Sequence, residues 1–571
     1  MARLRSKHSA LKILSCKFGG LAKHTPLSPG GAEDMCNFRI LPGGILKTRM
    51  GYQLKKHFSS LEKVRGVWEG TIGEVSLLLI VAGDKIYRLD GSSMTETVVG
   101  TIANAQTNVH FCAYLDDLYL LDGSNIYHYS PSTQKFIEME AYVPLYGYQW
   151  SPTSYGDVYE DINLLSPRLR VHYFNADASN VFRLPYFADA VDSVWADGKT
   201  ITNYTFTPGS NQITINASNP PSFVEIGFVA NLNEELRQKI LATQLSFIYS
   251  KNGQNRLFLW GKDARVFCSK NVTDYMLSAS RAMYPRTSSL YFCSDDILFL
   301  GDSTHPITTM CPFHDTVLAF CANRIWNISF EKGEISVTLS ASEIGCASPF
   351  GAIPYKNTVL AVMGGEFYRI SSLISHPEQL SFDRLSVGME GKLTSDFSER
   401  VQLFGNISDG EIWLRDPQNK SGEVWVWNTE SDEWYRFDNI PATLFFKIHN
   451  GFGFAQNNGI FLFDRSYHTD SDMPISAFYK SAYLDLGTPD IPSRSMHAYL
   501  YSTINGGNNS LLFETERSGK LFSLVPPISN ADAQLQTMRL LTHRHRFLRF
   551  TISTNATTPA EFYRLDIYSL P

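Results

Sequence analysis

The chain has 571 residues, a formal net charge of −6, 43% apolar residues and 19% charged residues. This length can hold three or four domains of about 150 residues each, and the composition excludes a disordered chain. The mildly acidic charge argues against a nucleic-acid coat over the whole chain but leaves a local basic patch open. Aromatic residues, at 13%, favour β-structure and broad assembly interfaces.

Eight cysteines are spread through the chain, and none forms a CxxC pair. Most lie in apolar, strand-like runs, so we predict buried free thiols in a reducing compartment. No apolar run approaches the roughly 18 residues that a membrane span requires, and we expect none. The basic N-terminus lacks an uninterrupted apolar stretch, so we expect no secretory signal.

The first segment, residues 1–60, is predicted to be a basic arm and a loop-rich start. Lysine and arginine dominate its first two dozen positions, and Gly-Gly pairs interrupt the rest. Four basic residues are candidate contacts to phosphate or to an acidic neighbouring subunit: Arg3, Arg5, Lys7 and Lys12. A solvated tail without a partner is the alternative.

Residues 61–141 contain two β units of about 40 residues, each with four short strands, which is the length of one propeller blade. A strand, a tight turn and a second strand recur at 83–93, 116–130 and 457–467. A short β unit cannot bury its apolar face alone and must stack on copies of itself. We therefore assign 61–141 to the first part of a β-propeller.

Residues 142–250 break this rhythm, with a Tyr-, Pro- and Gly-rich opening followed by new strand signals. We predict a small β-sandwich inserted into the propeller chain. Within it, apolar residues at 232, 236, 240 and 241 have the spacing of one amphipathic helix over 232–244.

The blade rhythm resumes over 251–470, which we assign to the second part of the propeller, with six to eight blades in total. Residues 471–571 alternate well without a helix signal and predict a C-terminal β-sandwich. The predicted fold class is therefore all-β: a β-propeller with an inserted small β-sandwich domain and a C-terminal β-sandwich.

Motifs for chemistry are absent from the sequence. It has no phosphate-binding glycine loop, no zinc-protease motif and no nucleophile elbow. Paired carboxylates fall at predicted turns, where solvated side chains are the ordinary case. We therefore expect no catalytic residue, no cofactor and no metal, and we do not expect an enzyme.

The densest ionisable patch lies in THRHRFLRF. A strand period would place His543, His545 and Phe547 on one face, with Arg544 and Arg546 on the other. Two histidines without acid partners make a poor metal site. An exposed basic strand at a subunit contact or near a phosphate backbone fits better, so Arg544 and Arg546 are candidate contacts. A plain solvated strand edge is the simpler alternative.

Three stretches resemble a known group. NFRILPGGILKTRMGY, 37–52, resembles the opening of phage virion proteins, in which an Asn and a Gly-containing turn precede an Arg-x-Gly. The stretch from SVWADGKTI to FVEIGF, 193–228, is similar to the small β-domain that interrupts tail-nozzle proteins of short-tailed bacteriophages. The ending, from FYKSAYLDLG to FYRLDIYSL, resembles the C-terminal sandwich of phage structural proteins.

The chain thus resembles tail nozzle or stopper proteins, of the tail tubular protein B and packaged-DNA stabilisation protein kind. The resemblance implies a structural virion protein that forms a ring, usually a hexamer, around the DNA exit channel and serves DNA retention and ejection. Its implied partners are further copies of itself, portal or adaptor proteins, tail fibre or tip proteins, and genomic DNA passing without sequence-specific contact. The implied location is the virion tail, after synthesis in the host cytoplasm, and no catalytic residue is implied.

Two other functions stay open. A receptor- or glycan-binding propeller adhesin of the tail tip would expose Trp425, Trp427 and Trp434 in a groove, although their alternation favours packing within a blade. A propeller hydrolase would need several acids converging at a central channel, and nothing in the sequence requires that.

Overall fold

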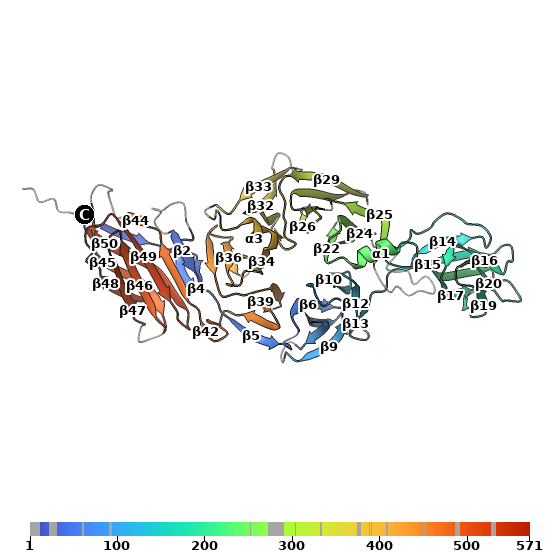
Figure 1. Cartoon of the computed structure of the whole chain (residues 1–571), viewed down its shortest axis with the longest axis horizontal. Coiled ribbons are helices and arrows are strands. Elements are labelled where there is room, and N and C mark those ends of the chain that lie inside the picture. Colours follow the sequence, from blue (N-terminus) through green and yellow to red (C-terminus); the bar gives the residue numbers. More distant parts are fainter. Residues whose placement is uncertain are drawn as a thin grey trace, which may run out of the picture. The chain divides into compact units, whose positions relative to one another are not determined.

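A computed structural model describes residues 12–570, apart from 22–30, 60–61, 91–93, 252, 272–289, 303, 332–333, 374–378, 388, 390, 407–408, 450, 486–491 and 527–532. The described chain is almost entirely β-structure (Figure 1). It divides into two compact units, one made of 1–64 with 346–571 and the other of 65–345. Each unit is described separately below.

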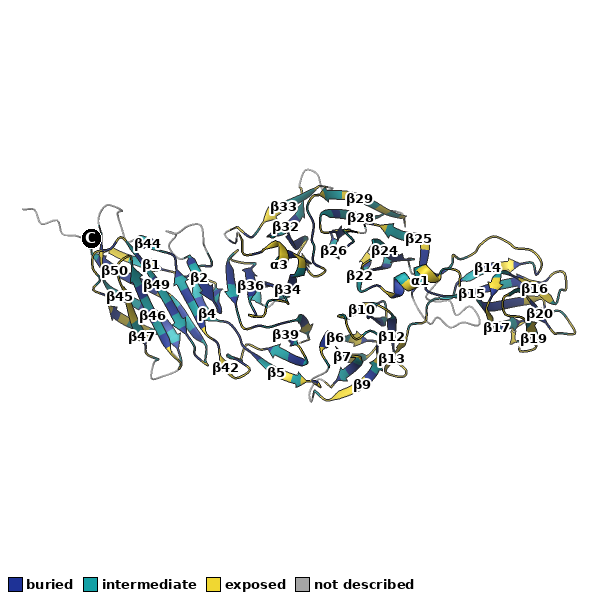
Figure 2. Ribbon diagram, viewed as in Figure 1, coloured by how far each residue is buried: buried dark blue, intermediate teal, exposed yellow. Residues whose placement is uncertain are grey.

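The 65–345 unit contains four sheets in which strands consecutive in sequence are neighbours. In the fourth strands β9 and β29 more than half of the residues are exposed, and Figure 2 shows this for β9. The first two sheets are the blade-like repeats that the sequence predicts over 61–141. The first two sheets are β6 (Val64–Ile72), β7 (Val75–Ala82), β8 (Lys85–Leu89), β9 (Glu96–Thr101) and β10 (His110–Tyr114), β11 (Asp117–Leu121), β12 (Ile126–Ser130), β13 (Lys135–Glu138). The other two are β22 (Leu245–Lys251), β23 (Gln254–Trp260), β24 (Arg265–Ser269), β25 (Phe292–Phe299) and β26 (Thr309–Phe313), β27 (Thr316–Phe320), β28 (Arg324–Glu331), β29 (Glu334–Ser342).

The predicted insert is a two-sheet domain with a hydrophobic core of its own. Its larger sheet has the order β14-β15-β21-β17-β18 and its smaller sheet the order β16-β20-β19. The strands are β14 (Leu145–Trp150), β15 (Arg168–Phe174), β16 (Val181–Ala188), β17 (Ala190–Ala196), β18 (Lys199–Thr200), β19 (Tyr204–Phe206), β20 (Ser210–Ile215) and β21 (Phe223–Val229).

The helix predicted over 232–244 is present as α1 (Glu234–Leu241), with Ile240 and Leu241 buried. The predicted end of the insert at 250 is too late, because β22 pairs along its whole length with β23 and so belongs to a blade. The α1 segment therefore leads the chain back into the blades.

The other unit contains three further blade-like sheets. In the last of them the fourth strand comes from the N-terminal segment, because β5 pairs with β40. The strands are β30 (Ala352–Tyr355), β31 (Thr358–Met363), β32 (Glu366–Ser372), β33 (Leu380–Arg384); β34 (Gln402–Asn406), β35 (Glu411–Arg415), β36 (Val424–Asn428), β37 (Trp434–Phe437); and β38 (Leu444–Ile448), β39 (Gly451–Gln456), β40 (Gly459–Phe463), β5 (Tyr52–His57). A short helix, α3 (Ser395–Arg400), precedes β34, and β41 (Thr469–Asp470) and β42 (Met473–Pro474) extend the last sheet.

Counting both units, the described residues form seven four-stranded blade-like sets, within the predicted six to eight. Such sheets are consistent with the blades of a β-propeller, and the all-β fold class is confirmed.

A C-terminal β-sandwich is present, and the N-terminal segment supplies part of it. One sheet has the order β3-β4-β50-β45-β48 with β1 beside β50, and the other the order β2-β43-β49-β46-β47 with β44 beside β49. The strands are β1 (Lys12–Cys16), β2 (Ala32–Cys36), β3 (Phe38–Leu41), β4 (Ile45–Thr48), β43 (Ala477–Ser481), β44 (Leu484–Asp485), β45 (Arg494–Ile504), β46 (Asn509–Thr515), β47 (Gly519–Leu524), β48 (Gln534–Arg539), β49 (Phe547–Thr554) and β50 (Ala560–Leu570).

The expectation of a loop-rich start over 1–60 is therefore wrong for its described part. Five short strands lie between residues 12 and 57, and they join three different sheets. Each strand is only four to six residues long. β1, β2 and β5 find their hydrogen-bond partners hundreds of residues away, so the local pattern gave no signal for them. β3 and β4 pair with each other across the Pro42-Gly43-Gly44 turn, as the turn flanked by short strands over 37–52 predicts.

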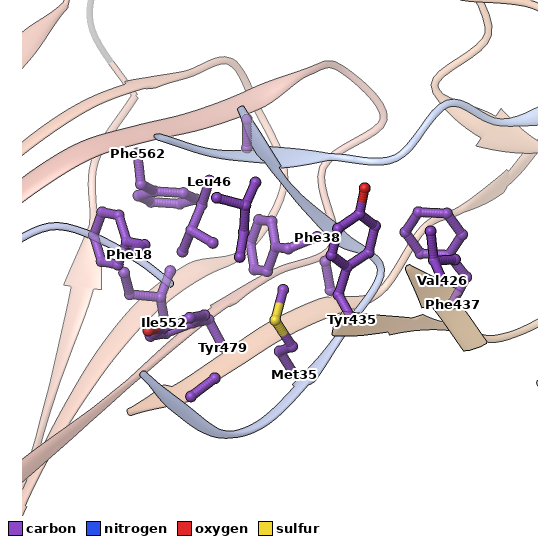
Figure 3. Packing of buried hydrophobic residues seen from close by; sticks show 14 of the residues in the cluster. Phe18, Met35, Phe38, Leu46, Val426, Tyr435, Phe437, Tyr479, Ile552 and Phe562 are labelled. Atoms are coloured by element: carbon purple, nitrogen blue, oxygen red, sulfur yellow. The ribbon is translucent and has the colours of Figure 1, made fainter. Parts of the chain in front are cut away.

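One hydrophobic core joins the sandwich to the neighbouring blades within this unit. Phe18, Phe38 and Leu46 of the N-terminal segment pack among residues of both (Figure 3). The Phe38 ring meets Phe562 of β50 edge to face at 5.8 Å, while Tyr435 and Phe437 of β37 belong to the same core. The N-terminal segment is thus a buried layer of the unit.

A buried ion pair fixes this segment. Both side chains of the pair, Arg49 and Asp470, are almost fully buried, and their closest oxygen–nitrogen distance is 2.5 Å. The Arg49 guanidinium also donates to Asn37 Oδ1 at 2.9 Å and to the carbonyl oxygens of Met50 and Asp438 at 3.0 and 2.9 Å. All of its N–H groups are directed at acceptors, as a buried charge requires.

Asn37 completes this cluster, and its backbone has a φ of 59°. Asn tolerates this left-handed conformation better than most residues. Its amide donates to Asp438 Oδ1 at 2.5 Å and to the Ser476 carbonyl oxygen at 2.7 Å, while its Oδ1 accepts from the Asp438 N–H at 2.9 Å. We call Asn37, Arg49, Asp438 and Asp470 the clasp. The Asn, Arg and Gly of the 37–52 motif thus have a structural role.

The glycine of that motif, Gly51, has no room for a side chain. A Cβ on Gly51 would lie 2.0 Å from the Thr469 carbonyl oxygen, whereas a Cβ on Gly519 would meet nothing closer than 3.7 Å. We expect Gly51→Ala to lower the free energy of unfolding by about 3 kcal/mol, since backbone must move. Gly519→Ala should change it by under about 1 kcal/mol. Chemical denaturation of both variants measures this, and equal midpoints would contradict it.

Breaking the clasp on one side should cost more than removing the pair. Arg49→Met leaves the Asp470 carboxylate buried without its cation, and we expect a loss of about 3–5 kcal/mol in unfolding free energy. Arg49→Met combined with Asp470→Leu removes both charges and should recover a substantial part of that loss. A double-mutant cycle by denaturant unfolding tests this; strictly additive losses would show that the two side chains are not coupled.

Candidate basic site

The predicted basic contacts fall into two groups. Arg3, Arg5 and Lys7 lie outside the described residues. Lys12, Arg544 and Arg546 are described and exposed. The sequence placed the first of these in an arm and the other two in a strand more than 500 residues later.

Strand pairing brings these residues to one end of the C-terminal sandwich. Lys12 opens β1 opposite Ser569 of β50, and Ser569 in turn lies opposite Ser495 of β45. Just before β45, Ser493 forms a β-bridge with His545, which stands between Arg544 and Arg546. Neighbouring strands are about 4.8 Å apart, so the three cations share one edge of the molecule.

Two further exposed arginines lie at the same end. Arg494 is the first residue of β45, and Arg517 lies in the turn between β46 and β47. The end of β46 lies beside the start of β49, because Thr515 pairs with Leu548. We name the five residues the basic end: Lys12, Arg494, Arg517, Arg544 and Arg546. None of their side chains has an ion-pair partner within the described part of the chain.

The expected strand over THRHRFLRF begins later than predicted. β49 starts at Phe547, and His543 and His545 do not share a face, since His543 is exposed and His545 is buried. His545 contacts Ser495 Oγ at 3.2 Å and Thr542 Oγ1 at 3.1 Å, so the loop is pulled inward at this point. The turn leaves both Arg544 and Arg546 outside, which keeps them available as contacts.

Two carboxylates also lie at this end, Glu516 and Asp485. The Glu516 carboxylate accepts from the backbone N–H groups of Arg546 and Phe547 at 2.8 and 3.4 Å. Burial opposes its ionisation, but these backbone bonds and His545 outweigh it and lower the pKa of Glu516. Asp485 pairs through its backbone with Phe547. Glu516 orders the loop that carries the arginines and leaves their guanidinium groups free.

Unpaired guanidinium groups that are exposed together bind anions. Arginine forms two parallel hydrogen bonds with a carboxylate or phosphate, and several such groups make a surface that is sensitive to salt. The basic end can therefore hold a phosphate backbone or an acidic protein surface. Sequence reasoning found three of its members but could not group them, because their proximity depends on pairing between β1, β50 and β45.

One pocket of this unit is a poorer candidate site than the basic end. It measures about 630 Å³ and is lined by side chains that include Phe404, Phe452 and Phe463. Its carboxylate Asp409 already pairs with Arg39 at 3.0 Å and Arg465 at 2.8 Å. The polar groups around it therefore serve the packing of β34 to β40 against the N-terminal segment.

The competing expectations can be compared with the described residues. Trp425, Trp427 and Trp434 are buried, so their exposure in a groove is wrong and their packing within a blade is confirmed. Trp434 Nε1 donates to the Leu385 carbonyl oxygen at 2.8 Å, which ties its sheet to the preceding one. Among the described residues, His, Cys, Asp and Glu do not gather in threes as potential metal ligands.

Comparisons with known proteins give little beyond the fold. No protein-family model and no curated protein matches the sequence. The chain is similar to an extracellular domain assigned to a one-component system, BT4673, of B. thetaiotaomicron, with 8% identity over 92% of this chain and 62% of that one and a TM-score of 0.36. It is also similar to the AfRom2 CNH domain, with 8% identity over 73% of this chain and 99% of that one and a TM-score of 0.35.

Likeness at this level carries no functional argument. The chain is all-β and its sheets resemble β-propeller blades, as the strand pairing shows. In the part of the chain that the structure describes, no helix is long and apolar enough to cross a bilayer.

The cysteines are buried free thiols, as predicted, and all eight are described. Burial raises the pKa of Cys112 to about 11 and, with help from Asp566, that of Cys16 to about 12. The thiolate is the reactive form, so we expect the folded protein to resist a thiol-alkylating reagent at pH 8. All eight should react after denaturation. Mass spectrometry counts the adducts, and rapid labelling of the folded chain would contradict the burial.

Proposed function

We propose that this chain is a structural virion protein that forms a ring, as a nozzle or stopper, around the DNA exit channel of a phage tail. The observation that carries the proposal is the basic end, an exposed cationic surface at the edge of a unit whose N-terminal segment is locked in by the clasp. In this role the protein works by assembly and has no catalytic task. It would act in the tail of the virion, in DNA retention and ejection.

The construction suits a component that bears load. In the unit made of 1–64 with 346–571, blade-like sheets and the C-terminal sandwich share one hydrophobic core. This shared core makes the unit stiff where the sandwich begins. Closed cyclic symmetry then needs only one surface on each copy that fits another surface on the next. With a net charge of −6 per copy, a ring repels DNA overall, which favours sliding over sticking.

The proposed partners follow from this role. They are further copies of the chain, portal or adaptor proteins, tail fibre or tip proteins, and DNA contacted without sequence-specific recognition. A glycan- or receptor-binding adhesin of the tail tip is the second candidate, and it has lost the three tryptophans as its exposed platform.

The experiment is imaging and weighing of the purified protein. Mass photometry and negative-stain microscopy should give one closed ring species, six copies being the expected number, and labelling should place the protein in the tail of the virion. A strictly monomeric protein at micromolar concentration that is also missing from virions would overturn the proposal.

The basic end should contribute measurably to the ring. Arg544→Glu combined with Arg546→Glu reverses two exposed charges that have no intramolecular partner, so folding should be unchanged while assembly or anion binding weakens about tenfold. Lys420→Glu, at an exposed residue far along the sequence from the basic end, is the matched control. Ring dissociation on dilution, followed by mass photometry, measures the effect. Equal dissociation of both variants would show that the basic end makes no contact in the assembly.

A further inference from the structure

A strip of aromatic side chains lies on the outer face of the larger sheet of the insert. Tyr148 of β14, His172 of β15 and Phe223 of β21 follow one another across three strands, and Tyr159 and Phe174 lie at the two ends. Tyr148 and Tyr159 are each 48% exposed, Phe174 is 47% exposed and Phe223 is 42% exposed. We call these five residues the aromatic strip.

The strip is on the face of the larger sheet that is turned away from the smaller sheet. The opposite face packs on β16, β20 and β19, where Val171, Ile226 and Phe182 are fully buried. The outer face of such a two-layer antiparallel domain is normally polar. Exposed apolar side chains gathered on it are typical of an interaction surface.

The rings are arranged against each other. Tyr148 and His172 stack at 5.3 Å with 22° between their planes, and His172 and Phe223 stack at 6.0 Å with 24°. Burial lowers the pKa of His172, which keeps this ring neutral within the stack. Because these rings stack on one another, part of the ring-face area on which a sugar could stack is already used.

The charge around the strip selects the partner. Residues 145–229 contain eight carboxylates and four basic residues, a net charge of −4. Asp157, which is exposed, stands two residues before Tyr159, and the Asp197 carboxylate accepts from the Phe223 N–H at 2.9 Å. Acids at both ends of the strip repel phosphate groups, whether of nucleic acid or of a membrane. They attract a cationic protein surface.

The chain itself carries such a surface, the basic end. We propose that the aromatic strip is a contact surface for a second copy of this chain, and that it receives the basic end of that copy. Tyrosine, phenylalanine and arginine are the residues enriched at the centre of protein interfaces. The two patches differ, so the contact is heterologous; such a contact forms a ring where its rotation closes, which is the case that the proposed function requires.

This inference rests on the proposed function and assigns the anionic partner of the basic end. It concerns contacts between copies and assigns no contact between the two units of one chain. It also makes a distinct claim, because a ring could form through surfaces other than the strip.

The test compares two variants with the wild-type chain by mass photometry at matched concentration. Tyr148→Ser with Phe223→Ser should shift the assembled species to monomers, with at least a tenfold higher dissociation midpoint. Phe187→Ser is the control, since Phe187 is 71% exposed on β16 of the smaller sheet, outside the strip. A far-ultraviolet circular dichroism melt of each variant confirms that the fold is retained.

A charge swap tests the pairing itself. Arg546→Glu and Asp157→Arg should each weaken assembly when present alone. Mixing the two variants should restore an alternating assembly, in which one contact joins the two swapped charges and the other is wild type. Oligomers that survive the strip variant and ignore the swap overturn this inference and leave the ring proposal standing. A wild-type chain that stays monomeric sinks both. Binding of a glycan by a monomer, lost in the strip variant, would assign the strip to the adhesin alternative.

Discussion

The buried pair of Arg49 and Asp470 is the constraint on which the C-terminal half of the fold depends. A guanidinium group removed from water is tolerated only when every N–H finds an acceptor, and here the acceptors come from residues 37, 50, 438 and 470. These residues meet only when the N-terminal segment lies between the sandwich and the blades. The clasp thus specifies one path for a segment whose strands are too short to specify it alone.

That path determines where the surface groups are placed. β5 supplies the fourth strand of the last blade-like sheet, and β1 to β4 supply edges of both sandwich sheets. Because β1 lies along β50, Lys12 comes to the end of the sandwich where Arg494, Arg544 and Arg546 gather. The buried clasp and the exposed basic end are therefore connected through the N-terminal segment. The clasp holds this segment in place, and the exposed start of the segment contributes Lys12 to the basic end.

The blades could be predicted from the sequence because their information is local. Hairpins such as β11–β12 have both strands and the turn within about 15 residues, and α1 has its apolar spacing within two turns. Strands β1, β2 and β5 could not, because their partners β50, β43 and β40 lie hundreds of residues away, whereas β3 and β4 form a local hairpin. For the same reason only part of the site could be predicted. Each arginine of THRHRFLRF was visible as a charge, but the inward turn at His545 depends on Ser495 and Thr542.

The motif over 37–52 shows how a resemblance and a physical role can coincide. Asn37 needs a left-handed backbone and four hydrogen-bonding contacts, Arg49 needs its five donors satisfied, and Gly51 needs to be without a side chain. Each requirement follows from packing within a single copy, so the motif serves to hold the N-terminal segment in the fold. A partner is not needed to explain it. The residues left for partners are those that packing does not use: the free cations of the basic end and the uncovered rings of the aromatic strip. The proposed self-assembly uses these two unlike patches and leaves the buried motif to the fold of the single copy.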